Sequence, residues 1–241
     1  STPRTKLIKI WCIFFLLASL WALGLLIMVI SPSKPLALLS VRISNLIALF
    51  IPILYLHFVF LLTEQYQEKK KILFGHYIFT FVYFLSGILS PQNFIPDVSP
   101  KMSFHYYTEA GTLFYLFPFS FLWMAFYALR LLYQCHKQAD AVKKNQLKYV
   151  FIGTGIGFCG GFTTFPLVFD IPVYPWGVYL VPVYIFTVSY AILKHRLMDI
   201  NIVIKRSLVY SLLITIVTTG YLLFVFLGEK FSQGMFGYSS Q

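Results

Sequence analysis

The stretch LIKIWCIFFLLASLWALGLLIMVI, residues 7–30, contains one charged side chain, Lys9, and is otherwise almost entirely apolar. A hydrocarbon core about 30 Å thick needs roughly 20 helical residues, so this stretch is long enough to cross a bilayer. Six further apolar stretches of comparable length follow along the chain. The seven predicted spans are residues 7–30, 43–62, 72–89, 113–132, 149–169, 173–193 and 208–227.

The composition agrees with a membrane protein. Of the 241 residues, 59% are hydrophobic and 11% are charged, against roughly 45–50% and 25% in soluble domains. Only helices and closed barrels satisfy every backbone polar group in lipid. The apolar runs are continuous rather than alternating, which favours helices over a barrel. We therefore predict an all-α fold, a polytopic transmembrane helix bundle that forms one domain over residues 1–241.

The basic side chains are distributed unevenly when successive connections are assigned to alternate sides of the membrane. One side contains fifteen of the 19 Lys and Arg residues: Arg4, Lys6, Lys9, Lys69, Lys70, Lys71, Arg130, Lys137, Lys143, Lys144, Lys148, Lys194, Arg196, Lys205 and Arg206. The other side has only Lys34, Arg42, Lys101 and Lys230. Cytoplasmic loops carry the excess of Lys and Arg, so we predict a cytoplasmic N-terminus. This topology explains the net charge of +11 without a nucleic-acid partner.

The chain begins with Ser1 instead of Met and ends soon after the last predicted span. We therefore expect a piece of a longer protein, in which the soluble output domains lie outside this fragment. The first apolar stretch is too long for a signal-peptide core, and no small-residue cleavage site follows it. We expect it to be a retained helix.

The three cysteines do not form a disulfide framework. Cys12 and Cys159 lie inside predicted spans, and Cys135 lies in a predicted cytoplasmic connection. Free cysteine is among the most frequently buried residue types, so we expect the first two to be buried thiols.

The fifth predicted span contains a cluster of glycines. Gly155-x-Gly157-x-x-Gly160 has the spacing of a dinucleotide-binding loop, but that loop needs a preceding strand and a soluble βαβ unit, which are missing here. Gly153, Gly157 and Gly161 recur every four residues on one helix face. Such a face lets a neighbouring helix approach closely. We predict helix packing at these three residues, as either a fixed contact or one that moves during signalling.

Few ionisable groups lie inside the predicted spans. The two histidines among them are His57 and His76, and we expect both to be neutral, hydrogen-bonded helix residues. The sequence shows no metal-ligand spacing, hydrolase elbow, Walker loop or paired carboxylates. We therefore predict no metal, no cofactor and no catalytic activity in this fragment.

Two segments on the predicted outer side combine aromatic and polar residues. The first is residues 90–111, whose three prolines exclude a continuous helix in its first half, and the second is the turn at 170–177. Ligand pockets combine apolar walls with a few polar groups. The candidate ligand-binding residues are His105, Tyr106, Tyr107, Glu109, Asp170, Tyr174 and Trp176. The alternative is an aromatic belt at the membrane interface.

The connection between the sixth and seventh predicted spans carries the most specific sequence pattern. It resembles a signature of bacterial multi-span sensor kinases, in which Tyr-x-Ile-x-x-x-Arg-Leu is followed by Asp-Ile and then by Arg-x-Leu-Val-Tyr. The matching positions are Tyr190, Ile192, Arg196, Leu197, Asp199, Ile200, Arg206, Leu208, Val209 and Tyr210. The external Pro172-Val-Tyr-Pro175 is also similar to this family. The family is the N-terminal seven-helix membrane region of histidine kinases.

This resemblance implies a sensory input region in the bacterial cytoplasmic membrane, most simply of a two-component histidine kinase. In similar proteins an eighth span often follows and leads into cytoplasmic PAS, GAF, kinase or phosphatase domains. The resemblance also implies a homodimer formed through the full-length protein, with the lipid bilayer and a small ligand or membrane stimulus as partners. The alternatives are a fragment of a transporter or channel, and a membrane subunit of an enzyme that supplies only helices.

Residues 194–207 have a physical interpretation of their own. Basic side chains at both ends bracket the apolar Ile200, Ile202, Val203 and Ile204, which suits a short element at the inner membrane surface. We predict that this element couples the sixth and seventh helices, whereas the alternative is a loop that only anchors them. The candidate coupling residues are Arg196, Leu197, Asp199, Ile200, Arg206 and Tyr210.

Overall fold

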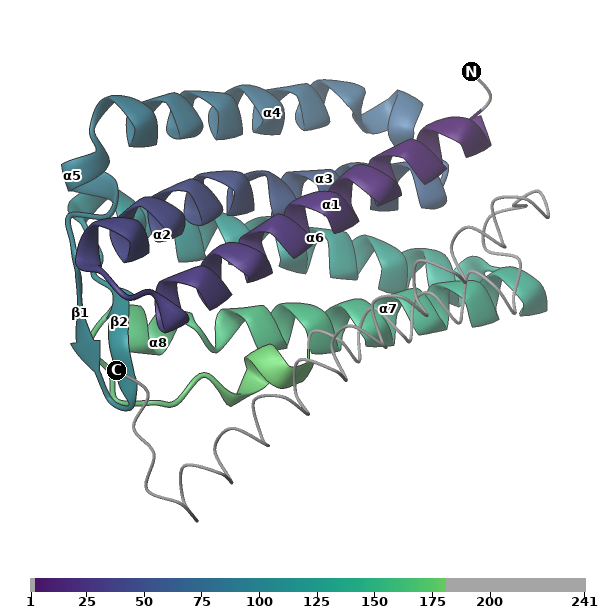
Figure 1. Cartoon of the computed structure of the whole chain (residues 1–241). Helices are drawn as coiled ribbons and strands as arrows, with labels where there is room; N and C mark the ends of the chain where they lie inside the picture. The colour runs from purple at the N-terminus through teal and green to yellow at the C-terminus, as the bar shows by residue number, and fades with distance from the viewer. Residues whose placement is uncertain (1–2, 181–241) are drawn as a thin grey trace, which may run out of the picture. The chain divides into compact units, whose positions relative to one another are not determined.

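The computed structural model describes residues 3–180 (Figure 1). The chain divides into two compact units, Ser1–Met198 and Asp199–Gln241, and all of the described residues belong to the first unit. The predicted span at 208–227, most of the span at 173–193 and the coupling residues Arg196, Leu197, Asp199, Ile200, Arg206 and Tyr210 lie outside the described residues.

Five apolar helical segments in the described part are long enough to cross a membrane. They are Lys6–Ile30, Lys34–Leu62, Tyr66–Leu89, Thr112–Gln138 and Lys143–Val168, and they correspond to the first five predicted spans. The prediction of a helical membrane bundle is confirmed at this level. The total of seven spans and the cytoplasmic N-terminus stay predictions.

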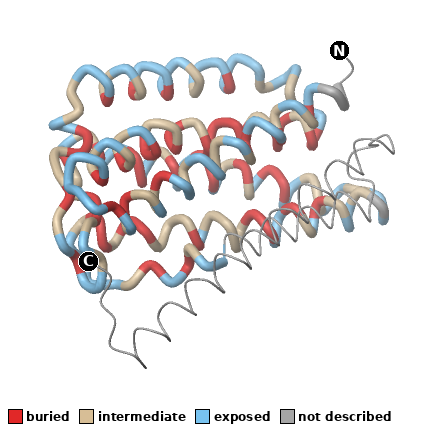
Figure 2. Tube along the Cα trace, in the orientation of Figure 1, coloured by how far each residue is buried: buried red, intermediate tan, exposed pale blue. Residues whose placement is uncertain are grey.

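The long helices are α1 (Pro3–Ile30), α2 (Lys34–Ala48), α3 (Phe50–Leu62), α4 (Tyr66–Leu89), α6 (Leu116–Gln138) and α7 (Ala141–Phe162). Helix α3 lies at the centre, because α1, α4 and α6 all pack against it, while α7 packs against α6. Residues 51–56 are buried without interruption. Figure 2 shows that buried residues are frequent where the central helices face one another. An apolar helix can face either lipid or protein, and α3 is buried because α1, α4 and α6 surround it.

The second membrane segment, Lys34–Leu62, is one helical run whose hydrogen-bond pattern lapses at Leu49, between α2 and α3. It begins nine residues before the predicted start, with Pro35 in its first turn, and Leu49 itself keeps helical dihedral angles (φ −57°, ψ −30°). Pro52 explains the interruption, because a proline has no N–H to donate to the carbonyl of Ala48. The residues before position 43 were not predicted as membrane helix because Lys34 and Arg42 interrupt the apolar pattern.

A two-stranded antiparallel sheet lies at one end of the bundle, and the all-α prediction missed it. After the short helix α5 (Pro91–Phe94), strand β1 (Val98–Lys101) pairs with β2 (Phe104–Thr108). The register pairs Val98 with Thr108 and has an irregularity between Ser99 and Lys101. Met102, in the turn, has a positive φ of 52°. We call residues 95–108 the hairpin. The chain then continues through η1 (Thr112–Tyr115) into α6.

The end of the bundle opposite the hairpin is formed by the α3–α4 and α6–α7 connections (Figure 1). The Lys143 Nζ lies 2.6 Å from Glu64 Oε1, so the two connections are joined by an ion pair. Asp140 caps α7 by accepting a hydrogen bond from the Lys143 backbone N–H at 2.8 Å.

The expectation for the cysteines inside the spans was wrong. Cys12 on α1 and Cys159 on α7 are both exposed on the protein surface, as free thiols. Membrane helices present one apolar face to lipid, so a cysteine inside a span does not have to face the protein interior.

Candidate sensory site

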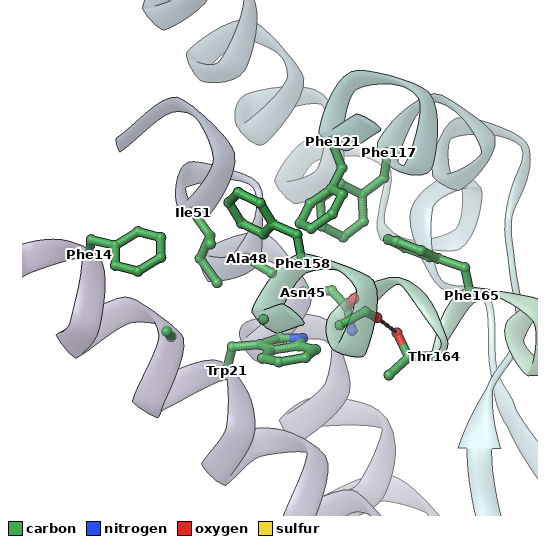
Figure 3. Close-up of a pocket in the computed structure, with 13 residues that line it drawn as sticks. Phe14, Trp21, Asn45, Ala48, Ile51, Phe117, Phe121, Phe158, Thr164 and Phe165 are labelled. Atoms are coloured by element: carbon green, nitrogen blue, oxygen red, sulfur yellow. Dashed lines mark hydrogen bonds between the residues drawn. The ribbon is translucent and has the colours of Figure 1, made fainter. Parts of the chain in front are cut away.

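A cavity of about 70 Å³ lies among the helices within their membrane segments (Figure 3). Its described walls come from α1, α2, α3, α6 and α7, from the short helix α8 (Phe165–Val168) and from the turn that leads into it. The lining residues are Phe14, Ala18, Trp21, Asn45, Ala48, Ile51, Phe117, Phe121, Gly157, Phe158, Gly161, Thr164 and Phe165.

Small residues create the space. Ala18, Ala48, Gly157 and Gly161 line the cavity on three different helices. A Cβ added at Gly161 would meet only the Trp21 ring, at 3.9 Å. Two predicted packing glycines, Gly157 and Gly161, therefore border open space in this structure.

The third predicted packing glycine is buried, but the closest packing on this helix occurs at a different glycine. Gly153 is buried, whereas a Cβ at Gly160 would run into the backbone carbonyl of Gly177 in η2 (Trp176–Leu180). Close backbone approach is thus seen at Gly160, a position outside the predicted four-residue repeat.

The cavity has three polar side chains and no charged one among its described lining residues. Asn45 donates from Nδ2 to the Val41 carbonyl at 2.9 Å, and Thr164 donates from Oγ1 to the Gly161 carbonyl at 2.8 Å. Both are buried. The third is the Trp21 indole, which is half-buried.

The hairpin contacts this cavity through Tyr107. Its hydroxyl donates to the Thr164 carbonyl at 3.1 Å, and the side chain is only 4% exposed. Burial raises the pKa of the Tyr107 phenol, so the group stays a neutral donor. Among the predicted ligand residues, Tyr107 is therefore one that contacts a lining residue of the cavity, Thr164.

A second contact joins the hairpin to the turn after α8. The buried Lys101 Nζ lies 3.1 Å from the Val168 carbonyl oxygen and 2.9 Å from Asp170 Oδ1. Asp170 has a positive φ of 61°, which is uncommon for a residue other than glycine. The ion pair gives a reason why this turn conformation is retained.

The other side of the hairpin is fastened to α2. Arg42 donates from Nε to the Ile95 carbonyl at 2.9 Å and from Nη2 to the Pro96 carbonyl at 3.1 Å. Lys34 Nζ lies 2.6 Å from Asp97 Oδ2 on the surface. This hydrogen bond from Lys34, together with one from the Val98 N–H, lowers the pKa of the Asp97 carboxyl. The hairpin thus joins the start of α2 to the turn that precedes η2.

The predicted ligand residues are partly brought together. Phe104 bridges the two segments, because its ring centroid lies 5.3 Å from those of both Tyr107 and Tyr174. Tyr174 also lies 4.6 Å from Trp176.

The remaining predicted ligand residues do not converge on one point. His105 is exposed and contacts Tyr106 at 4.4 Å between centroids, and Trp176 is 70% exposed. Glu109 is half-buried and is placed by its backbone N–H, which donates to Asp97 O at 3.1 Å. A ligand-binding role for these residues stays a prediction.

The two histidines inside the spans are hydrogen-bonded, as predicted. His57 Nδ1 lies 2.9 Å from the Tyr77 hydroxyl, and the ring stacks on Tyr66 at 5.4 Å between centroids. His76 Nδ1 lies 2.8 Å from the Ile72 carbonyl, one turn earlier in its helix.

Sequence reasoning missed Arg42, Asn45 and Lys101. A usable signal existed for Arg42, since a lone arginine beside an apolar run needs a partner. Lys101 offered none, because a lysine between Pro100 and a turn is normally solvated. Asn45 was overlooked because it is uncharged and stands alone in its span.

The comparisons with known proteins agree with the resemblance in the sequence. A family model described as the N-terminal 7TM region of histidine kinase matches residues 3–201. No curated protein and no solved structure matches the chain. The family gives no support to the alternative of a transporter or channel fragment. On the match over most of its length, the chain belongs to the family of N-terminal seven-transmembrane regions of histidine kinases.

Proposed function

We propose that this membrane sensory input region transmits a signal through the hairpin, which links α2 to the turn before the sixth span. The observation that carries the proposal is the pair of attachments on opposite sides of the hairpin, Arg42 to residues 95 and 96 and Lys101 to residues 168 and 170. A displacement on one side is passed to the other because both attachments end on the same short sheet.

The stimulus in this proposal reaches the outer side of the membrane. The predicted ligand residues Tyr107, Asp170 and Tyr174 belong to the segments that the hairpin joins. A small ligand or a membrane stimulus that separates these segments would favour one of two helix arrangements. Helix-packing shifts of this kind are a common basis of switching.

The proposed topology has seven spans, a cytoplasmic N-terminus and the hairpin outside, in the bacterial inner membrane. The bias of Lys and Arg towards the ends opposite the hairpin supports it. Fusion of a periplasm-active reporter after Gln92 should give activity, and fusion after Lys144 should give none. Activity after Lys144 would overturn the orientation.

The proposed output is autophosphorylation by a dimeric full-length kinase of a two-component system. A ratio of two near-equal states changes tenfold for about 1.4 kcal/mol, so the loss of one partly buried contact is enough to alter output. The proposal therefore predicts that the basal output depends on Lys101.

The test is Lys101→Met in the full-length kinase in vesicles, with basal autophosphorylation as the readout. The substitution keeps an unbranched apolar stem and removes both polar contacts. We expect a changed basal rate at normal membrane insertion. Ser103→Ala, an exposed change in the turn of the same hairpin, is the matched control and should leave the rate unchanged. Equal rates for Lys101→Met and the wild-type protein would reject hairpin coupling.

A further inference from the structure

We propose that the cavity between α1, α3, α6 and α7 binds an uncharged, lipid-soluble small molecule that has one ring or a short alkyl body and one hydroxyl or carbonyl group. This site is separate from the Arg42 and Lys101 attachments on which the proposed function rests. Its walls, its mouth, its polar groups and its size each restrict the ligand.

The walls select an apolar body with a flat or narrow shape. Phe121 lies edge-on to Phe158 at 5.2 Å between centroids, and Phe117 lies edge-on to Phe165 at 5.4 Å. Phe14 and Trp21 complete the aromatic lining from α1. Aromatic side chains favour edge-to-face and offset contacts with another ring, so a single-ring occupant has suitable partners.

The mouth lies along the seam between α1 and α7. The half-exposed lining residues are Ala18 and Trp21 on one helix and Gly157, Phe158 and Gly161 on the other. Those on α2, namely Asn45 and Ala48, are buried. All of these residues belong to segments long and apolar enough to span the membrane. We take the ligand of this proposal to be lipid-soluble, because the seam belongs to segments that are apolar along most of their length.

The polar groups select an uncharged ligand with a hydrogen-bonding group. The Thr164 hydroxyl uses its proton on Gly161, which leaves its oxygen as an acceptor, and Asn45 uses Nδ2 on Val41, which leaves Oδ1 as an acceptor. Trp21 is a donor, and its indole N–H forms no hydrogen bond within residues 3–180. A carboxylate or ammonium would meet no counter-charge among the described lining residues, and burial of an unpaired charge is unfavourable.

A second pair of hydroxyls lies behind Phe158. Tyr55 packs edge-on against Phe158 at 4.8 Å between centroids. Its hydroxyl and that of Thr154 are fully buried neighbours without hydrogen-bond geometry to any group in the described residues. An occupant that displaces the Phe158 ring would reach partners for a polar group at this end too.

The size limits the ligand. A volume of about 70 Å³ exceeds by several times the roughly 10–15 Å³ that one water needs. The space accommodates part of a single ring or a short chain. The rest of such a molecule lies in the mouth between α1 and α7.

The experiment measures binding directly by ¹⁹F NMR of three probes added to the full-length protein in nanodiscs: 4-fluorobenzyl alcohol, 4-fluorotoluene and 4-fluorobenzoate. We expect the alcohol to show saturable exchange broadening, the toluene weaker broadening and the benzoate none. Empty nanodiscs report partitioning into lipid and provide the baseline.

Two glycine variants on one helix locate the site. Gly161→Leu places its side chain into the cavity, where a Cβ meets only Trp21 at 3.9 Å, and should abolish saturable binding. Gly155→Leu adds the same side chain where a Cβ meets nothing within 4 Å, and should bind as the wild type does. Gly161→Ala provides a milder variant if the leucine prevents folding, and it should weaken binding.

A change at Thr164 tests the polar contact. Thr164→Val should weaken alcohol binding by about 3- to 10-fold, the loss expected for one hydrogen bond, and leave toluene binding unchanged. Thr164→Ser should restore the difference between the probes. Saturable binding that survives both Gly161 variants, or benzoate binding as tight as that of the alcohol, would overturn the proposal.

The outcome is independent of hairpin coupling, because the NMR readout does not require a signal. Autophosphorylation measured on the same samples separates the two proposals. Binding with no change in kinase output upholds the site, and a Lys101 effect without any probe binding rejects the site while it leaves hairpin coupling intact.

Discussion

The hairpin and the helical interior are held together by different kinds of contact. At the hairpin, three long side chains, Arg42, Lys101 and Tyr107, donate hydrogen bonds to backbone carbonyls far away in sequence. In the interior, aromatic rings such as Phe121 and Phe165 pack around a space that small residues leave open. The hairpin therefore depends on directional bonds, whereas the interior depends on the packing of apolar side chains.

The difference follows from what each backbone leaves unsatisfied. A helix satisfies its own peptide groups, so packing is what remains to be decided between helices in lipid. A two-stranded sheet has two edges with unpaired groups, and it is marginal by itself. The side chains of α2 and the hairpin provide the missing stability through directional bonds.

The largest expected effect is the loss of the tightest backbone contact. Gly160→Val would place Cβ against the Gly177 carbonyl, whose backbone cannot yield as a side chain does. We expect destabilisation by about 1–3 kcal/mol or more, as for other overpacked sites. Thermal unfolding in detergent, followed by circular dichroism, measures it. Gly155→Val is the control and should unfold like the wild type, and a similar loss in both variants would contradict the assigned contact.

The next effect concerns the attachment of the hairpin to α2. Arg42→Met removes two charge-assisted bonds, to the carbonyls of Ile95 and Pro96. We expect a local loss of roughly 2 kcal/mol, seen as faster hydrogen exchange of the 95–108 amides. Arg42→Lys keeps the charge but lacks the planar fork, so it should recover only part of the protection. Full protection in Arg42→Lys would show that charge alone matters.

The same tyrosine-to-phenylalanine change, made once in the hairpin and once in the helical interior, tests whether the two regions depend on different kinds of contact. Tyr107→Phe removes a hydrogen bond to the Thr164 carbonyl, and we expect it to cost about 0.5–1.5 kcal/mol. Tyr55→Phe removes a buried hydroxyl that lacks hydrogen-bond geometry to any described residue, and it should be neutral or stabilising. Unfolding midpoints of the two variants test the pair. Equal destabilisation would mean that the interior also depends on directional bonds.

The smallest effect is the pH response of the exposed pair between Lys34 and Asp97. Because the folded state lowers the pKa of Asp97, the pair contributes stability above the ordinary carboxyl value of 3.8 and loses it as pH falls through the lower folded value. Hairpin protection, corrected for intrinsic exchange, should be flat from about pH 5 to 8 and decline at more acidic pH. Asp97→Asn should remove this acid dependence, and an unchanged profile would assign it to another group.

The sequence predicted the helical part well because membrane spans are read from length and hydrophobicity alone. The hairpin escaped prediction for a physical reason: residues 98–108 contain Pro100, Lys101 and Met102, and they lack a clean alternation of apolar and polar side chains. The lapse in hydrogen bonding at Leu49 was not predicted either, although Pro52 is its visible cause.

The candidate site was predictable only in part. Tyr107 was recognised because an aromatic residue with a polar tip suits a binding surface. The cavity depends on which small residues face one another across helices, and Ala18, Ala48 and Gly161 belong to three different spans. A single sequence contains no information on that pairing. The predicted glycine face likewise included Gly161 but not Gly160. These two residues are adjacent in the helix and point in different directions, so Gly161 borders the cavity while Gly160 contacts the Gly177 backbone.

The lapse in hydrogen bonding at Leu49 lies in the wall of the cavity, because Ala48 and Ile51 on either side of it are both lining residues. At 1.5 Å per residue α2 is about 20 Å long, so a tilt of about 10° at this point would move its far end by roughly 4 Å. Arg42 lies on α2 and donates to the hairpin. The same helix therefore borders the cavity at one end and holds the hairpin further along, so any change in its tilt would act on both.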